Sequence, residues 1–161
     1  MTSDEMAAAT LKALEGKPCW YVNAGGAAGA TFSLAIGGKT PRTVPLTNPT
    51  VSDDFRQFEG EWNLYIWCSW RLEDERGAIA SSYQPEVDGA AVLKSLTGQV
   101  LGNVVLDPHS LDLCLEFDRS RLVIFCDHVL PASETDCNWE LTAGARSLVA
   151  GPGSSYKVEG N

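Results

Sequence analysis

The chain has 161 residues, enough for one domain with a sizeable hydrophobic core. It carries 21 acidic and 12 basic residues, which gives a formal net charge of −9 at pH 7. Because phosphate backbones and anionic lipids repel such a surface, the charge argues against nucleic-acid and membrane partners and favours a basic protein partner.

The N-terminal segment from Thr2 to Leu14 is predicted to form a helix. Thr2 and Glu5 have the spacing of a capping box, in which each side chain bonds the backbone N–H of the other residue. An alanine-rich run follows and stops before Gly16, a residue type that commonly follows the end of a helix.

Two short strands with glycine-rich connections are expected next. Residues 19–22 (CWYV) and 31–36 (TFSLAI) are rich in side chains typical of strands, and the loop 23–29 (NAGGAAG) joins them as a hairpin. Gly37–Gly38 then predicts a turn, and the proline-bearing segment 40–58 predicts an irregular excursion.

The segment Glu61–Glu73 (EWNLYIWCSWRLE) predicts one long, half-buried strand around which the domain is organised. Its side chains alternate between an apolar and a mostly polar face, the pattern of a strand with one side against a core. At about 3.3 Å per residue it would span roughly 40 Å, so it must twist or bend, which suits a curled sheet. A shorter strand is expected at 78–82. The apolar face of the long strand carries Trp62, Leu64, Ile66, Cys68, Trp70 and Leu72.

The second half of the chain repeats the first. Residues 8–16 (AATLKALEG) and 90–98 (AAVLKSLTG) align at an offset of 82, with six of nine residues identical. Further matches keep the same order along both copies, so the sequence predicts a tandem duplication. They join 31–36 to 112–117 at an offset of 81, 63–68 to 121–126 at 58, and both 70–72 to 139–141 and Ile79 to Leu148 at 69.

The predicted fold is a single α+β domain over residues 1–161, β-rich and built from two tandem helix-plus-antiparallel-sheet repeats at about 7–82 and 89–151. The repeats are expected to pack about a pseudo-twofold axis, as in a dimer fused into one chain, and to share one core. The resulting sheet is expected to be curled and barrel-like.

The two copies differ by inserted residues. The first copy has extra residues between Lys39 and Asn63, and the second has extra residues between Cys126 and Trp139. The second insert would make the strands on either side of it a hairpin, and a bulge near Ser69 would reconcile this with the straight run of the first copy.

The cysteines and the N-terminus favour a cytoplasmic location. The chain has five cysteines, an odd number without a C-x-x-C pair, and Cys68 and Cys126 fall within apolar strand runs as reduced cysteines do. The first residues carry acids where a signal peptide needs bases, and no run approaches the ~18 apolar residues of a membrane helix.

No motif points to a catalytic residue, a metal site or a cofactor. The glycine-rich loop 23–29 lacks the spacing of a dinucleotide-binding motif and is followed by a strand, which favours a hairpin loop over a phosphate site. His109 and His128 match no zinc-ligand spacing, although Asp127, Asp136 and Cys137 could gather near His128. The acidic pairs, such as Asp53–Asp54, are typical of solvated loops. A catalytic triad can assemble from residues that are distant in sequence, so spacing alone does not exclude one. No local signature supports a triad, and an enzyme is therefore the least favoured of the three readings.

The candidate binding surface is the polar face of the long strand. Tyr65 and Trp67 lie there beside Arg71, and these residue types are enriched at protein interfaces. The second copy places Val123 and Phe125 at the equivalent positions, which favours a face covered by a helix or by the other repeat, with an exposed binding patch as the alternative. The candidate binding residues are Glu61, Tyr65, Trp67 and Arg71.

Residues 60–71 (GEWNLYIWCSWR) and 96–99 (LTGQ) resemble a group of small uncharacterised bacterial proteins with a G-E-W-x-L-x-I-x-C-x-W-R-like core and a later L-x-G-Q element. The resemblance implies no activity and no catalytic residues. In size, charge and expected architecture the chain also resembles immunity proteins that neutralise toxins. These observations favour a non-enzymatic protein-binding module, with a small-ligand binder that uses the cleft between the repeats as the alternative.

Overall fold

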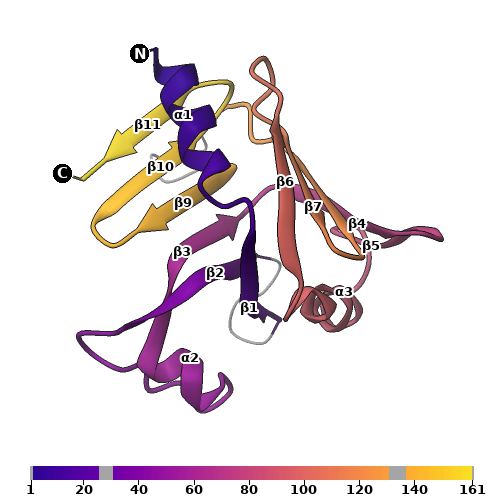
Figure 1. The fold of residues 1–161 in the computed structure, drawn as a ribbon. Coiled ribbons are helices and arrows are strands. Elements are labelled where there is room, and N and C mark those ends of the chain that lie inside the picture. Colours follow the sequence, from indigo (N-terminus) through magenta and orange to yellow (C-terminus); the bar gives the residue numbers. More distant parts are fainter. Residues whose placement is uncertain (1, 26–30, 131–136, 161) are drawn as a thin grey trace.

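The structure is a computed structural model that describes residues 2–25, 31–130 and 137–160. Most of the glycine-rich loop 23–29 therefore lies outside the described residues. Figure 1 shows the arrangement of the elements. They are α1 (Ser3–Lys12), β1 (Lys17–Ala24), β2 (Phe32–Pro41), α2 (Asp53–Gln57), β3 (Phe58–Ile66), β4 (Ser69–Asp74), β5 (Gly77–Ser81), α3 (Glu86–Leu93), the 3-10 turn η2 (Lys94–Leu96), β6 (Val100–Leu106), β7 (Leu113–Phe117), β8 (Arg121–Phe125), β9 (Trp139–Ala143), β10 (Arg146–Ala150) and β11 (Tyr156–Glu159).

The described strands form one antiparallel sheet in the order β11-β10-β9-β3-β2-β1-β6-β7-β8-β4-β5. The prediction of a β-rich antiparallel fold is thus confirmed. The sheet is open, with β11 and β5 at its two ends, so the barrel-like closure is corrected. Only Lys17–Leu101 and Pro18–Val100 join β1 to β6, and this short contact divides the sheet into two halves (Figure 1).

The connections exchange hairpins between these two halves. β3 ends beside β2 in one half, and the chain then continues as the β4–β5 hairpin, which pairs with β8 in the other half. β8 ends beside β7, and the chain returns as the β9–β10 hairpin, which pairs with β3. β8 and β9 are therefore not two strands of one hairpin, contrary to the sequence-based interpretation.

The segment 61–73 is two strands, which corrects the single long strand expected from its alternation. β3 ends at Ile66 and β4 begins at Ser69, because the chain crosses here from one half of the sheet to the other. The alternation itself continues across the break. Leu64, Ile66, Cys68, Trp70 and Leu72 are all buried.

Gly37–Gly38 is not a turn. β2 continues through both glycines to Pro41, with a register shift against β3 between Ile36 and Lys39. Gly37 has a φ of 89°, the left-handed conformation that glycine adopts at a β-bulge. The excursion 40–58 holds the short helix α2, and β11 at the C-terminus was not anticipated.

Helices α1 and α3 cover the core side of the sheet, and α2 lies on its other face. The capping box of α1 is present, since Thr2 N–H donates to Glu5 Oε2 at 2.7 Å and Glu5 N–H donates to Thr2 Oγ1 at 3.1 Å. One large cluster of buried apolar side chains joins both halves of the sheet to α1 and α3. A second, smaller cluster of Ala35, Val51 and Phe55 lies on the opposite face of the sheet, under α2.

The two edge strands of the sheet, β11 and β5, have different surroundings. β11 pairs along β10 over four residues, from Ser147 to Ala150. At the other end, the side chain of Gln84 accepts a hydrogen bond from Ser81 N–H at 2.7 Å, and Gln84 N–H donates to Ser81 O at 3.3 Å. In the described ranges, no helix combines the length and the apolar character needed to cross a bilayer.

Candidate functional site

A stacked aromatic pair lies on the outer face of the sheet. Tyr65 is near the end of β3 and Trp67 follows that strand, so both point away from the core into which Leu64 and Ile66 are buried. Their ring centroids are 5.7 Å apart with an interplanar angle of 17°. Each residue is 37% exposed, so the face is covered only in part.

The backbone holds this pair in place from two sides. Tyr65 is paired with Ser33 on β2 and with Glu140 on β9. Trp67 N–H donates to the backbone carbonyl of the fully buried Asn138 at 2.9 Å. Tyr65 therefore lies on a strand with a neighbour on each side, and Trp67 follows that strand.

Charged groups surround the Tyr65 hydroxyl. Partial burial raises the pKa of Tyr65, and the carboxylates of Glu140 and Glu59 act in the same direction, while Arg42 opposes them. Burial also raises the pKa of Glu140, with Glu159 as the next cause. Tyr65 therefore stays protonated at neutral pH and offers a hydroxyl that can both donate and accept a hydrogen bond.

Arg42 connects this surface to the α2 excursion. Its guanidinium lies over the Phe55 ring at 4.7 Å and its Nε donates to Phe55 O at 2.9 Å. The same guanidinium is 3.8 Å from Glu59. Phe55 stacks in turn on Tyr21 with ring centroids 4.3 Å apart. The segment 40–58 is therefore packed against β1 and β3 through Phe55 and Arg42.

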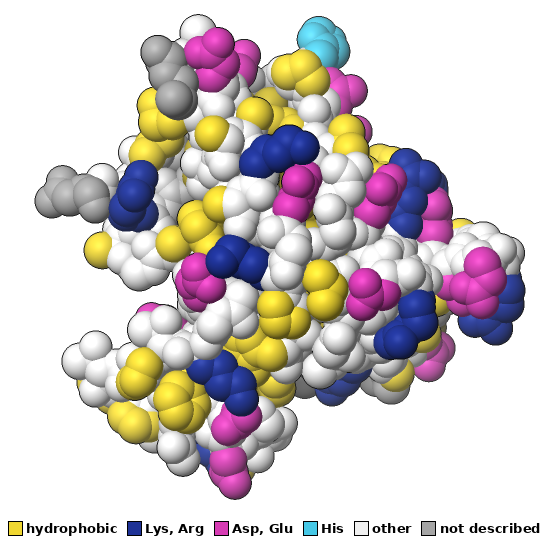
Figure 2. All heavy atoms as spheres, in the orientation of Figure 1, with side chains coloured by type: hydrophobic (Ala, Val, Ile, Leu, Met, Phe, Trp, Pro, Cys, Tyr) yellow, Lys and Arg dark blue, Asp and Glu magenta, His cyan; other side chains and the backbone are white. Residues whose placement is uncertain are grey.

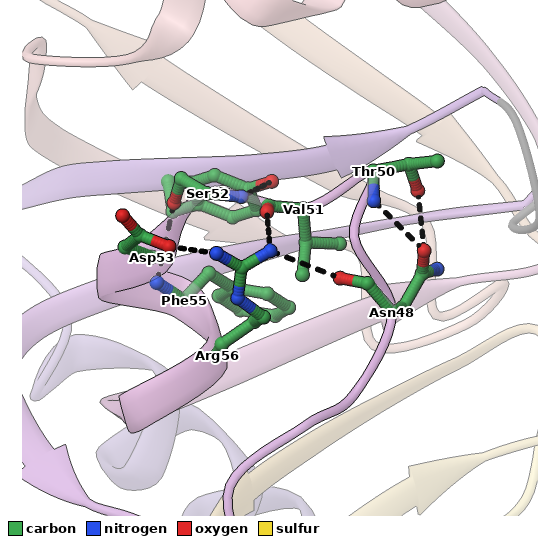
Figure 3. A network of polar contacts seen from close by, with 8 residues as sticks. Asn48, Thr50, Val51, Ser52, Asp53, Phe55 and Arg56 are labelled. Atoms are coloured by element: carbon green, nitrogen blue, oxygen red, sulfur yellow. Dashed lines mark hydrogen bonds and ion pairs between the residues drawn. The ribbon is translucent and has the colours of Figure 1, made fainter.

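Polar contacts of Arg56 fix the loop that enters α2, as Figure 3 shows. The Arg56 guanidinium pairs with Asp53 and donates to the carbonyls of Val51 at 3.2 Å and Asn48 at 3.5 Å. Ser52 caps the helix by accepting from Phe55 N–H at 3.2 Å. This explains why a segment with proline and acidic residues is ordered and can support the neighbouring surface.

Arg71 and Glu61 lie apart from the aromatic pair. Arg71 is on β4, where its guanidinium is 5.2 Å from the centre of the Phe125 ring and its Nε is 2.7 Å from Glu73. Glu61 accepts from Gly38 N–H at 3.0 Å and from Lys17 Nζ at 3.0 Å, and these contacts lower its pKa. The four predicted residues therefore contain one pair in contact and two residues with structural partners of their own.

A groove of about 290 Å³ is the second candidate site, and sequence reasoning did not identify its residues. It lies between α1 and the strands β9 to β11, so both predicted repeats contribute to it. The alanine-rich composition of the N-terminal helix could have indicated this groove, because small side chains leave space between a helix and a sheet. The lining residues are Met6, Ala7, Ala9, Thr10, Trp62, Leu141, Ala143, Arg146, Ser147, Leu148 and Val158.

Two polar groups distinguish the groove. The indole N–H of Trp62 is buried, and its interaction with the neighbouring Glu61 carboxylate is one of the contacts that lower the pKa of Glu61. The side chain of Arg146 is exposed at the groove. The notch at the left of Figure 2, between the upper part with α1 and β9 to β11 and the lower part with α2, is a separate feature from this groove.

The histidines do not assemble a metal centre in the described part of the chain, where no three His, Cys, Asp or Glu side chains lie close enough to hold an ion. His128 Nδ1 is 2.9 Å from the backbone carbonyl of Cys137. Asp136 lies outside the described residues. The Asp127 carboxylate accepts hydrogen bonds from the backbone N–H and the hydroxyl of Ser69. These bonds link the two segments where the chain crosses between the half-sheets.

Comparisons with known proteins add no relative. No protein-family model, no curated protein and no solved structure matches this chain.

Proposed function

We propose that this chain is a non-enzymatic, cytoplasmic protein-binding module of the immunity type, and that Tyr65 and Trp67 form the centre of its partner surface. The observation that carries the proposal is the stacked pair itself, with each residue 37% exposed on the outer face of the sheet. Tyrosine and tryptophan supply large contact areas at a low cost in side-chain entropy, which is why they dominate interface hot spots.

The partner is proposed to be a basic protein. The chain carries a net charge of −9, and the carboxylates of Glu59 and Glu140 lie beside the aromatic pair. A positively charged partner is steered toward such a surface, whereas nucleic acids and anionic membranes are repelled. The resemblance to small uncharacterised bacterial proteins is compatible with this role and assigns no chemistry.

The experiment compares the chain with Trp67→Ala and Tyr65→Ala variants. Immobilised protein is used to capture basic proteins from the native cells, and the affinity of each captured protein is then measured by calorimetry. We expect Trp67→Ala to weaken the specific complex at least tenfold while the melting temperature changes little, since truncation of a hot-spot aromatic costs about 2 kcal/mol or more.

Tyr83→Ala is the matched control, because Tyr83 is an aromatic residue that is 95% exposed and far along the chain from the pair. It should bind the partner like the unmodified chain. Equal affinities for Trp67→Ala and Tyr83→Ala would contradict the proposed surface, and a large loss of stability in Trp67→Ala would show that the residue serves packing instead.

We further propose that residues 7–82 and 89–151 are copies of one ancestral unit related by a pseudo-twofold axis. The strands on either side of the β1–β6 contact follow the same scheme, with β1, β2, β3, β9 and β10 on one side and β6, β7, β8, β4 and β5 on the other. The Cα partners Cys19–Ile36, Val22–Leu34 and Ala24–Phe32 correspond to Leu101–Phe117, Val104–Leu115 and Leu106–Leu113 at the aligned offsets.

The remaining pairs support the same alignment with one adjustment. Trp70 is opposite Ile124, and its aligned counterpart Trp139 is opposite Ile66. In the last hairpin, Leu72 is paired with Ala80 and Leu141 with Leu148. Ala80 thus takes the place that the sequence alignment gave to Ile79, because the β4–β5 ladder contains a register shift after Leu72.

The second candidate function is binding of a small ligand in the groove between α1 and β9 to β11. The largely apolar lining with the exposed Arg146 among it favours this function, because an amphipathic carboxylate could pack its chain against the apolar side chains and pair with the guanidinium. Titration with amphipathic carboxylates, followed by tryptophan fluorescence, should show a saturable change that Trp62→Phe reduces. The absence of saturation across that set would remove this candidate.

A further inference from the structure

Two cysteines meet where the chain crosses between the half-sheets. Cys68 lies between β3 and β4, and Cys126 directly follows β8. The β4–β8 ladder pairs Ser69 with Phe125. The next position along this antiparallel register places Cys68 opposite Cys126.

The register brings these two residues within the range of a disulfide. Directly opposite residues of an antiparallel pair have Cα atoms about 4.5–5.5 Å apart, and disulfides form across Cα distances of about 4.4–6.8 Å. The neighbouring Cys126 thiol is the largest cause of the raised pKa of Cys68, which indicates that the two thiols lie next to each other, and the Cys126 thiol donates to Leu111 O at 3.2 Å. Cys68 belongs to the large core cluster and Cys126 packs against it, so both side chains lie on the core side of the sheet.

The other cysteines lack this arrangement. Cys19 is fully buried and its thiol donates to the backbone carbonyl of Tyr21 at 3.6 Å. Cys114 accepts a hydrogen bond from Arg121 Nε at 2.8 Å. The ladders pair Cys19 with Ile36 and Cys114 with Val123, so neither of these cysteines is opposite another cysteine.

We propose that Cys68 and Cys126 are a redox modification site at which a reversible disulfide joins the two chain crossings. The site takes a low-molecular-weight disulfide such as oxidised glutathione as its oxidant. This inference is independent of the partner surface proposed above, because it rests on the β4–β8 register and on the thiol pair.

The reaction balances as two thiol–disulfide exchanges. Cys126, the less buried of the two, loses its thiol proton to solvent, and its thiolate attacks the oxidant to form a mixed disulfide with release of one thiolate. Cys68 then loses its proton and attacks the sulfur of Cys126, which expels the second thiolate. The protein loses two hydrogens and two electrons, and one oxidant disulfide becomes two thiols.

The environment explains why the reduced pair persists until an oxidant reaches it. The neighbouring Cys126 thiol and burial both raise the pKa of the Cys68 thiol, so Cys68 is a poor nucleophile by itself. Cys126 must react first, and Cys68 then resolves the mixed disulfide from the next position of the β4–β8 register.

The experiment oxidises the full chain with glutathione disulfide, blocks the remaining thiols and digests the protein with trypsin under non-reducing conditions. We expect a cross-link between peptides 57–71 and 122–146, which dithiothreitol removes. Because 122–146 also contains Cys137, the Cys137→Ser variant is the matched control and should form the same cross-link.

The disulfide should also raise the melting temperature by roughly 10 °C, because it closes a loop of about 58 residues in the unfolded chain. Cys68→Ser and Cys126→Ser should each abolish both the cross-link and the shift. The inference is overturned if peptides 57–71 and 122–146 stay separate in the oxidised unmodified chain, or if the cross-link survives in Cys126→Ser. Peptide mapping of the unmodified chain decides the question even if a serine variant fails to fold.

Discussion

At the scale of single residues, a buried polar group without a hydrogen-bond partner makes a clearer prediction about stability than the many exposed carboxylates do. Tyr156 is the clearest case, since its hydroxyl is buried and has no hydrogen-bond partner among the described residues. Burial raises the pKa of Tyr156 to about 12, with Asp4 and Cys126 as further causes. The folded protein therefore keeps a phenol proton that the unfolded chain loses near pH 10.

Tyr156→Phe should test this directly. Because the unfolded state binds fewer protons than the folded state between about pH 10 and pH 12, the free energy of unfolding falls as the pH rises through that window. The variant should lose less stability there, and at neutral pH its stability should be equal or slightly higher. Denaturant melts at several pH values measure both effects. Tyr83→Phe is the control, and an equal pH dependence of the two variants would contradict the assignment.

The candidate site shows how much residue patterns can predict. Alternation along 61–73 identified Tyr65 and Trp67 as outward-facing residues, and both are exposed in part. It also grouped Arg71 and Glu61 with them. In the structure, however, Arg71 contacts Phe125 and Glu73, and Glu61 forms an ion pair with Lys17. Periodicity reports which face a side chain occupies, whereas the partners of that side chain depend on strands that are distant in sequence.

At the scale of elements, the same residues can encode two different local structures. Gly37–Gly38 was interpreted as a turn, yet it is a bulge inside β2, because β3 returns far enough along the chain to pair on both sides of it. The single strand predicted for 61–73 is divided for a related reason. The sequence of a strand shows that it can pair, but the neighbour with which it pairs depends on where the chain crosses between the half-sheets.

Gly37→Ala should destabilise the fold by about 1–2 kcal/mol. Gly37 has a φ of 89°, and a Cβ atom there would lie 2.5 Å from Glu61 Oε2, so both backbone strain and a clash oppose the substitution. Chemical denaturation measures the change. Gly38→Ala is the matched control, since the nearest atom to its added Cβ is 3.8 Å away, and a similar loss in both variants would argue against the bulge conformation.

At the scale of the whole molecule, hairpin exchange makes each half of the chain depend on the other. The β4–β5 hairpin finds its partner strand in β8, and the β9–β10 hairpin finds its partner in β3. The internal similarity in the sequence predicted two units, but similarity alone cannot distinguish two units side by side from two units that trade hairpins. That distinction is carried by contacts between residues about 50 to 80 positions apart.

A chain divided after Tyr83 should therefore need both pieces to fold. Tyr83 is 95% exposed in the connection between β5 and α3, so the break itself removes little packing. We expect residues 1–83 and 84–161 to be largely unfolded alone and to form a one-to-one complex with native-like circular dichroism when mixed. Size-exclusion chromatography with light scattering measures the assembly. A stably folded, monomeric 1–83 fragment would contradict the exchange.

The strand β11 has a consequence for how the molecule behaves at high concentration. It occupies the outer side of β10, and Gln84 occupies the backbone of Ser81 at the opposite margin. β10 is thus shielded from a further strand, and the margin of that half is the four-residue β11, since short edge strands are one way in which sheet proteins avoid polymerising edge to edge. A protease that trims the last residues would uncover β10, and the trimmed protein would be the form expected to seed fibrils.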